Sequence, residues 1–382
     1  MARIYLDHAA TTTVRPEVVE AMAPFLGGGY NASSLHAEGR AARAAVDAAR
    51  ETVARIVGAV PREIVFTGGG TEADVLAVVG AARAQASRGR HIVTTAVEHH
   101  AVLRAADLLE REGWRVTRLP VDQRGLVDPD AFAAALTLET SIASVILANN
   151  EIGVIEPVAE LAAVAHARRV VFHTDAVQAA GWLPLDVDAL GVDLLSLSAH
   201  KFYGPKGVGA LYVRTGTPVE PLIVGGGQEH GLRAGTENVA GIVGFATALA
   251  LAEAERPATA ARVEALRDRL EAGILAAIPG VVVNGAGAPR LPGILSVAFA
   301  GAPSDALLIR LDLDGIAASA GSACAAGSLE PSHVIAALGL GEDYRGGVIR
   351  FSLGRATTGA EVEEVLNRLP PVLAAIRTPS TV

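Results

Sequence analysis

The chain has 382 residues, of which 51% are hydrophobic and 19% charged, and its formal net charge is −9 at pH 7. This length suits two domains, and the apolar content excludes a wholly disordered chain. The acidic balance argues against direct nucleic-acid binding, because there is no surplus of positive charge to neutralise phosphates. The most apolar uncharged run, Val239–Ala252, is too short to cross a bilayer, and the first residues lack the apolar core of a signal peptide. We therefore expect a soluble, cytoplasmic protein without a membrane segment.

Short apolar strands alternate with helix-like segments in the first half of the chain. The predicted strands are, in order, 62–67, 91–95, 116–119, 142–147, 170–173 and 194–198. A helix is predicted after the first strand, from Thr71 to about Ser87. Short buried strands that alternate with helices indicate a mostly parallel sheet covered by helices on both faces.

The pattern changes in the second half. A helical stretch is predicted from about Asn238 to Ile278, with an interruption at Pro257. Strands are predicted near 281–284, 295–300 and 348–353, before a last helix from Gly359 to about Ile376. We place a domain boundary near residue 256. This predicts a large domain over 15–255 and a small C-terminal domain over 256–382, with residues 1–14 packing near the small domain.

The basic residues are almost all arginines. The chain has 30 Arg and only two Lys, Lys201 and Lys206. Lysine can lose its proton and form a Schiff base with a carbonyl compound, which arginine cannot do. Lys201 follows a predicted strand, next to Ser198, His200 and a Gly-Pro turn. Because ligands of α/β sheets bind at the carboxyl ends of strands, this pattern favours a Schiff-base lysine beside an anion over a basic surface turn.

Other strand ends carry groups suited to a phosphate and an aromatic ring. Residues 68–71, which include Gly70 and Thr71, close one strand and open a helix, where backbone N–H groups and a hydroxyl can bind an anion. A flexible turn with a capping threonine is the alternative for this segment. Asp175 could keep a pyridinium nitrogen protonated with Gln178 nearby, although an isolated Asp there is also typical of a helix cap. The ring of His99 could stack on a flat cofactor.

Cys324 is the only cysteine, so internal disulfides and cysteine-based metal clusters are excluded, and we expect no metal. Its neighbours are Gly, Ala and Ser, a composition typical of a mobile loop. This setting favours an exposed, reactive thiol over the buried thiol that a cysteine within an apolar strand would indicate.

Several segments, in this order, resemble the cysteine desulfurases of the NifS/IscS type, within the fold-type I (class V aminotransferase) pyridoxal-phosphate enzymes. They include YLDHAATT (5–12), IVFTGGGTEAD (64–74), TTAVEHHAV (94–102), NNEIGVIEP (149–157), HTDAVQAAG (173–181), SAHKFYGPKGVGALY (198–212), GGGQEHGLRAGTEN (225–238), SAGSACAAGSLEPSHV (319–334) and IRFSLGR (349–355). The resemblance implies an α/β fold, with a mostly parallel sheet sandwiched by helices in a large domain and a smaller α+β domain.

The resemblance also implies a role for each candidate residue. Lys201 would hold pyridoxal 5'-phosphate as a Schiff base and His99 would stack on the ring and transfer protons. Asp175 would pair with the pyridinium nitrogen and Gln178 with the phenolic oxygen. The implied phosphate ligands are Gly70, Thr71, Ser198 and His200, joined by Thr236 from the other subunit of a homodimer. The implied substrate ligands are Asn150 and Arg350, which would bind the carboxylate of L-cysteine, and the implied nucleophile is Cys324.

The implied activity is removal of sulfur from L-cysteine, which gives L-alanine and a persulfide on Cys324 for transfer to an acceptor protein. Iron–sulfur cluster assembly, tRNA thiolation and other acceptors stay open, because the chain ends without the longer tail that some members use to bind a scaffold. A selenocysteine lyase, or another fold-type I lyase that does not use Cys324, is the alternative. A non-catalytic relative would be expected to lack Lys201, His99 or Cys324. A nicotinamide dehydrogenase would carry G-x-G-x-x-G after its first strands, which is missing here.

Overall fold

The computed structural model describes residues 3–321 and 332–377. Its largest element is a seven-stranded sheet with the order β2-β8-β7-β6-β5-β3-β4. The strands are β2 (Ile64–Thr67), β3 (His91–Thr95), β4 (Arg115–Leu119), β5 (Thr140–Ser144), β6 (Val171–Asp175), β7 (Leu194–Ser198) and β8 (Gly209–Val213). Neighbouring strands run parallel except at β8, which is antiparallel to β2 and to β7. The predicted mostly parallel sheet is confirmed.

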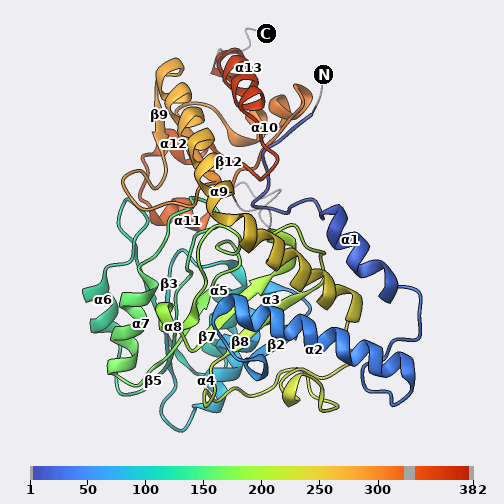
Figure 1. The fold of residues 1–382 in the computed structure, drawn as a ribbon. Helices are drawn as coiled ribbons and strands as arrows, with labels where there is room; N and C mark the ends of the chain where they lie inside the picture. Colours follow the sequence, from blue (N-terminus) through green and yellow to red (C-terminus); the bar gives the residue numbers. More distant parts are fainter. Residues whose placement is uncertain (1–2, 322–331, 378–382) are drawn as a thin grey trace.

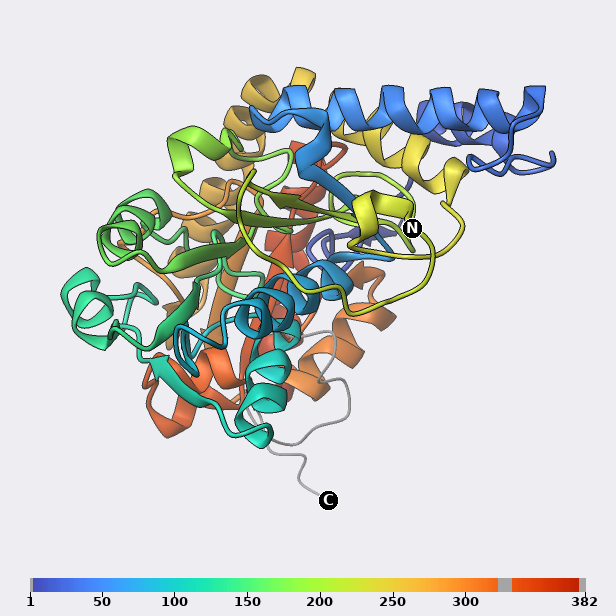
Figure 2. The ribbon, with the colours of Figure 1, turned by 90° about the horizontal axis from the view of Figure 1, so that it is seen from below.

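Helices cover both faces of this sheet, as Figures 1 and 2 show. They are α1 (Pro16–Met22), α2 (Ala37–Val57), α3 (Gly70–Val75), α4 (Ala81–Ala84), α5 (His100–Arg111), α6 (Pro129–Ala135), α7 (Val158–Ala167), α8 (Val187–Leu190) and the long α9 (Val239–Ala277). Alternate strand residues enter different cores: Ile142 belongs to the core that contains residues of α3 and α5, whereas Ala143 belongs to the core that contains residues of α2, α7 and α9. Side chains of a strand point to opposite faces in turn, so each strand contributes to both cores.

The predicted helix after β2 is present with one irregularity. Residues 70–84 are continuously helical, but Leu76–Gly80 between α3 and α4 form a π-helical segment, η3. Four further short helices are 3₁₀ turns: η1 (Ala23–Phe25), η2 (Pro61–Glu63), η4 (Ala199–Lys201) and η5 (Gln228–Gly231). Among the described residues, no helix is both long and apolar enough to span a membrane.

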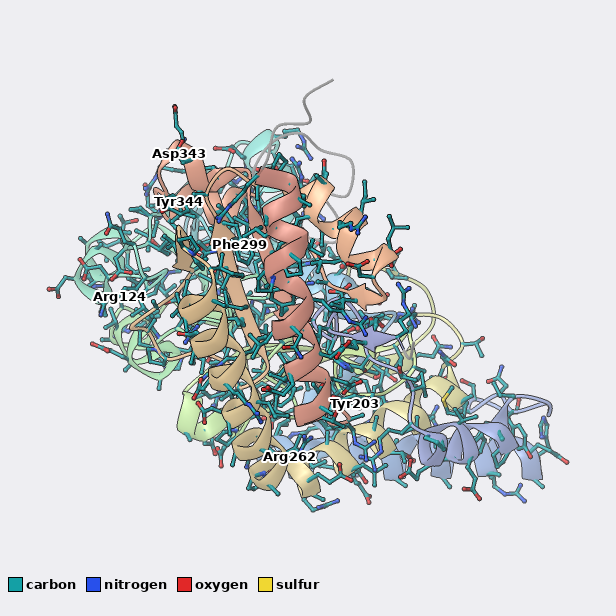
Figure 3. The ribbon with its side chains drawn as sticks, turned by 90° about the horizontal axis from the view of Figure 1, so that it is seen from above. Arg124, Tyr203, Arg262, Phe299, Asp343 and Tyr344 are labelled. Atoms are coloured by element: carbon teal, nitrogen blue, oxygen red, sulfur yellow. The ribbon has the colours of Figure 1, made fainter. Side chains whose placement is uncertain are left out.

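A second, smaller sheet lies above the first in Figure 1. Its strands are antiparallel in the order β12-β10-β9, namely β12 (Val348–Ser352), β10 (Ile294–Phe299) and β9 (Val281–Val283). Nearby, β1 (Ile4–Tyr5) pairs in parallel with β11 (Ile316–Ala317). The accompanying helices are α10 (Ser304–Leu313), α11 (His333–Ala337), α12 (Glu342–Arg345) and α13 (Gly359–Arg377). Figure 3 shows α13 and the C-terminal half of α9 side by side over this sheet, with Phe299 of β10 in the same region. Ile4 and Leu6 belong to the core that these elements share.

Helix α9 connects the two sheets. Its first part packs on the large core through Ile242 and Phe245, and its last part packs on the small core through Leu270 and Ile274. The interruption expected at Pro257 is wrong, because the helix runs through this residue without ending. Packing of both halves outweighs the loss of a single backbone donor. The predicted boundary at residue 256 thus falls inside one helix, and the assignment of residues to two domains stays a prediction.

A buried ion pair ties α2 to the loop that follows β8. Arg50 of α2 binds Glu229 of η5 in a bidentate manner, at 2.6 and 2.7 Å, and both side chains are almost fully buried. The same carboxylate accepts a hydrogen bond of 2.8 Å from the backbone N–H of Phe66 in β2. Glu229 itself has a left-handed backbone conformation, with a φ of 46°. These contacts hold the strained turn against the sheet.

Replacing Glu229 by alanine should therefore destabilise the fold. The change leaves the Arg50 guanidinium buried without its partner, and such losses cost about 3–5 kcal/mol of the free energy of unfolding. Urea unfolding followed by circular dichroism measures the effect. The matched control is Glu253→Ala, which removes a partly exposed partner of Arg256 and should cost no more than about 1 kcal/mol. Equal, small losses in the two variants would show that the Arg50–Glu229 pair does not stabilise the fold as described.

Candidate active site

One cavity collects the side chains at the carboxyl edge of the large sheet. It has a volume of about 260 Å³ and is lined by residues from the ends of several strands. Of the predicted site residues, those that line it are Gly70, Thr71, His99, Asn150, Asp175, Gln178, Ser198, His200, Lys201 and Arg350. They come from six separate stretches of the chain, so the topology of the sheet and β12 brings them together. This is the edge where ligands of α/β folds bind.

Lys201 lies in η4, directly after β7. Its Nζ donates hydrogen bonds to the backbone carbonyls of Ala9, at 2.6 Å, and Ala10, at 2.9 Å. The side-chain amide of Gln178 also donates to the Ala9 carbonyl, at 2.9 Å. The segment that contains YLDHAATT is held in turn by a 2.9 Å bond from the Ala9 N–H to the hydroxyl of Ser352 in β12. The N-terminal segment thus forms one wall of the cavity.

Asp175 is the last residue of β6 and is buried at the bottom of the cavity. Burial raises the pKa of its carboxyl to about 6, while the Val177 N–H at 2.9 Å and the positive charge of Lys201 act in the opposite direction. The carboxyl is therefore mostly ionised at neutral pH. A buried carboxylate in this place suits a cationic ring nitrogen.

His99 precedes α5 and caps it, since its Nδ1 accepts a hydrogen bond from the N–H of Ala101 at 3.2 Å. Burial lowers the pKa of the ring to about 4, and the positive charge of Lys201 adds to this effect. The ring is neutral at physiological pH. Because Nδ1 accepts, the single ring proton is on Nε2, where it is available for transfer.

The start of α3 offers a group of anion donors. A side chain at Gly70 would place its Cβ 2.9 Å from Val177 Cγ2 and 3.2 Å from Ser198 Cβ, so only glycine permits this close approach. The hydroxyls of Thr71 and Ser198 line the cavity beside it. His200 contacts Thr11 Oγ1 through Nδ1 at 3.2 Å, and burial lowers its pKa to about 4, so it is neutral there. Hydroxyls and backbone N–H groups at a helix start fit a phosphate group.

Arg350 of β12 approaches the cavity from the smaller sheet. Its side chain is buried and donates to Asp7 Oδ1 at 2.9 Å and to the backbone carbonyl of Asn150 at 2.7 Å. The Nε–H of Arg350 has no hydrogen-bond partner within residues 3–321 and 332–377. A buried guanidinium with an unused donor can bind a carboxylate.

Two predicted site residues are not placed in this cavity. Cys324 lies outside the described residues. The residues that flank its segment are nevertheless close to the cavity: a Cβ added at Gly321 would lie 2.6 Å from Glu151 Oε2, and Ser332 hydrogen-bonds the same Glu151 carboxyl. Thr236 is exposed and does not line the cavity of its own chain, so its expected contribution to a second subunit stays a prediction.

Sequence analysis missed several residues that help to build the site. Asp7 orients Arg350, the Ala9 carbonyl binds Lys201, and Asp74 lines the cavity beside Asp175. Each lies within a segment that was noted for its resemblance, namely residues 5–12 or 64–74. The resemblance therefore pointed to both segments, but the spacing of residues along the chain does not show that the two segments meet in the cavity.

Known proteins are similar to this chain over almost its whole length. The sequence profile described as Aminotransferase class-V matches residues 4–365. The chain belongs to the class V aminotransferase family. Family members include a cysteine desulfurase IscS from Dictyoglomus turgidum, which is 49% identical over 376 residues, covering 98% of this chain and 95% of that protein. A cysteine desulfurase from Cereibacter sphaeroides is 50% identical over 380 residues, covering 99% and 97% of the two chains.

Solved structures of the family share this fold. A NifS-like protein superposes with a TM-score of 0.91 at 37% identity, covering 98% of this chain and 100% of that chain. A NifS-like protein from Rickettsia africae superposes with a TM-score of 0.87 at 30% identity, covering 97% and 99%. The expected fold-type I architecture is therefore confirmed.

Proposed function

We propose that this chain is a pyridoxal-phosphate-dependent cysteine desulfurase. It converts L-cysteine to L-alanine and passes the sulfur, as a persulfide on Cys324, to an acceptor protein. The observation that carries the proposal is the meeting of Lys201, Asp175, His99 and Arg350 in one cavity. Full-length similarity to proteins named cysteine desulfurase supports it. A homodimer, an acceptor from a sulfur-transfer system and a cytoplasmic location are further parts of this proposal.

The residues of the cavity fit pyridoxal phosphate. Lys201 would bond its carbonyl carbon, and Asp175 and Gln178 would hold the ring nitrogen and the phenolic oxygen. Backbone N–H groups at Gly70 and Thr71, with Ser198, would bind the phosphate. When bound, the cofactor withdraws electrons from the Cα of the substrate.

The protein supplies binding and proton transfer. Arg350 and Asn150 bind the substrate carboxylate and so orient Cα toward Lys201. The Lys201 amine would take the Cα proton, and the neutral ring of His99 would exchange a proton through Nε2. The ionised Asp175 carboxylate provides the negative charge that would face the positively charged ring nitrogen during each of these steps.

Cys324 carries the sulfur. Its thiolate attacks the substrate sulfur, an S–S bond forms, and the Cβ–S bond breaks. The electron pair of that bond remains on Cβ, which takes up a proton and becomes the methyl group of alanine. The enzyme sulfur and the substrate sulfur then form the persulfide, so the step needs no external oxidant. A thiol reductant later releases the outer sulfur as sulfide, with oxidation of two thiols to a disulfide.

Arg350→Lys should raise KM for L-cysteine by about 10–100-fold, with a smaller change in kcat, because a lysine cannot keep the Asp7 and Asn150 contacts and also bind the carboxylate. Steady-state kinetics separate the two constants. Arg355→Lys is the matched control, since Arg355 is partly exposed and lies outside the cavity. A variant that loses kcat alone would show that Arg350 does not bind substrate.

The test of function uses purified protein with pyridoxal phosphate, L-cysteine and a thiol reductant, with alanine and sulfide quantified together. The proposal expects equal amounts of the two products. A chain that releases alanine only from L-selenocysteine, and does so equally well as Cys324→Ala, would instead be the alternative lyase. If neither substrate gives alanine, the desulfurase proposal is wrong.

A further inference from the structure

A second buried carboxyl lies beside Asp175. Asp74 is in α3, only 1% of its surface is exposed, and it lines the same cavity. One carboxylate oxygen from each of Asp74 and Asp175 and one ring nitrogen of His99 lie within 4.8 Å of one another. Asp74 Oδ1 has no hydrogen-bond partner in the described part of the chain. Asp74 has no role in the proposed mechanism.

The groups around Asp74 supply little positive charge. His173 of β6 approaches Asp74 Oδ1 to 3.7 Å, but both of its ring nitrogens hydrogen-bond to serine hydroxyls, Ser144 at 2.8 Å and Ser196 at 2.9 Å. Burial lowers the pKa of His173 to about 3, so the ring is neutral. His99 is neutral for the same reason.

The remaining charged groups that face the pair are Glu98 and Lys201. Glu98 follows β3 and is fully buried, and burial raises its pKa well above the usual range, which favours its uncharged form. Lys201, after β7, is the cation that acts on Asp175. The cavity wall therefore holds two carboxyls, Asp74 and Asp175, with one lysine, and Glu98 lies beside them outside the cavity lining.

Two carboxylates this close, inside a protein, cannot both be ionised without a large cost. The contacts decide which one keeps its proton. Asp175 accepts the Val177 N–H and is stabilised by Lys201, and both effects favour its ionised form. For Asp74, burial raises the pKa most and the charge of Asp175 raises it further, which outweighs a hydrogen bond from Ser196.

We propose that the carboxyl group of Asp74, in the wall of the cofactor cavity, stays protonated next to the ionised Asp175. The pair then carries one negative charge, which matches the single positive charge of a pyridinium ring. The significance for the cofactor rests on the proposed function, but the protonation state of Asp74 does not.

The direct test is carbon-13 NMR of the full chain labelled at the aspartate carboxyl carbon, with and without pyridoxal phosphate. Loss of a resonance in Asp74→Asn and in Asp175→Asn assigns the two signals. At pH 7, we expect the Asp74 signal at the position of a protonated carboxyl in both samples, and the Asp175 signal at the ionised position when cofactor is bound. An ionised Asp74 at pH 7 would overturn the proposal. If Asp74→Asn does not fold, sequential assignment of the wild-type chain identifies the same signal.

Cofactor affinity gives a second readout. Since asparagine is neutral and similar in shape, Asp74→Asn should keep the dissociation constant of pyridoxal phosphate within about threefold at pH 7, whereas Asp175→Asn should weaken it by at least about tenfold. Equal weakening in the two variants would contradict a neutral Asp74. A wild-type chain that binds no pyridoxal phosphate would refute the proposed function, while the NMR result without cofactor would still decide the state of Asp74.

Discussion

Lys201→Ala should abolish turnover of L-cysteine, with a fall in kcat/KM of at least about 10⁴-fold. In the proposed mechanism the amine is needed twice, to bond the cofactor and to take the Cα proton, and the only other lysine, Lys206, does not line the cavity. The visible absorbance of lysine-bound pyridoxal phosphate should disappear as well. Product formation and absorption spectra of the purified variant measure the two effects.

Lys201→Arg distinguishes the chemistry of the amine from its charge. Arginine retains a positive charge near Asp175 and can still donate to the Ala9 and Ala10 carbonyls, but it neither forms a Schiff base nor loses its proton. We therefore expect this variant to be as inactive as Lys201→Ala while its circular dichroism spectrum is that of the wild type. Substantial turnover by either variant would remove Lys201 from the mechanism.

Asp175→Asn should be the second most damaging change, with kcat/KM lower by at least about 100-fold. The substitution keeps the shape of the side chain, but it removes a negative charge from the buried cavity. In the proposed function, Asp175 would hold the ring nitrogen of the cofactor in its protonated form, so its loss would weaken electron withdrawal from the substrate. The pH dependence of the bound-cofactor absorbance should change together with the rate.

Glu98→Gln is the matched control for Asp175→Asn. Glu98 is a buried carboxyl that hydrogen-bonds Thr95 Oγ1 at 2.8 Å and the Ile146 N–H at 2.9 Å, but it does not line the cavity. Its replacement should alter stability more than the absorbance or rate of the bound cofactor. A loss of rate equal to that of Asp175→Asn would mean that the loss of any buried carboxyl, rather than contact with the ring, explains both variants.

Local sequence patterns were sufficient for much of the large sheet and for the residues at its edge. Strands β3, β6 and β7 are short, apolar and bounded by turn residues, and they were predicted to within a few residues. Asp175 is the last residue of β6, and Lys201 lies in the short helix directly after β7. A parallel sheet places the carboxyl ends of its strands at one edge, so the position of a residue after a strand predicts its place in the fold.

Other features depend on contacts between distant segments. Strand β8 was not among the predicted strands, and its antiparallel pairing with β2 and β7 is visible only in the folded chain. Pro257 indicated a break that packing on both sides of α9 prevents. Asp74 was not singled out from the sequence, because its burial beside Asp175 appears only when the chain is folded.

The central claim is that Cys324 receives sulfur from L-cysteine. The most direct measurement incubates the pyridoxal-phosphate-loaded enzyme with L-cysteine in the absence of reductant, and determines the mass of the peptide that contains Cys324 together with the alanine released. The account predicts a peptide heavier by at least one sulfur atom in wild type, with alanine formed in proportion, and neither product in Cys324→Ala, although that variant still binds the cofactor. Alanine release by Cys324→Ala at the wild-type rate, or an unmodified Cys324 peptide after turnover, would contradict it.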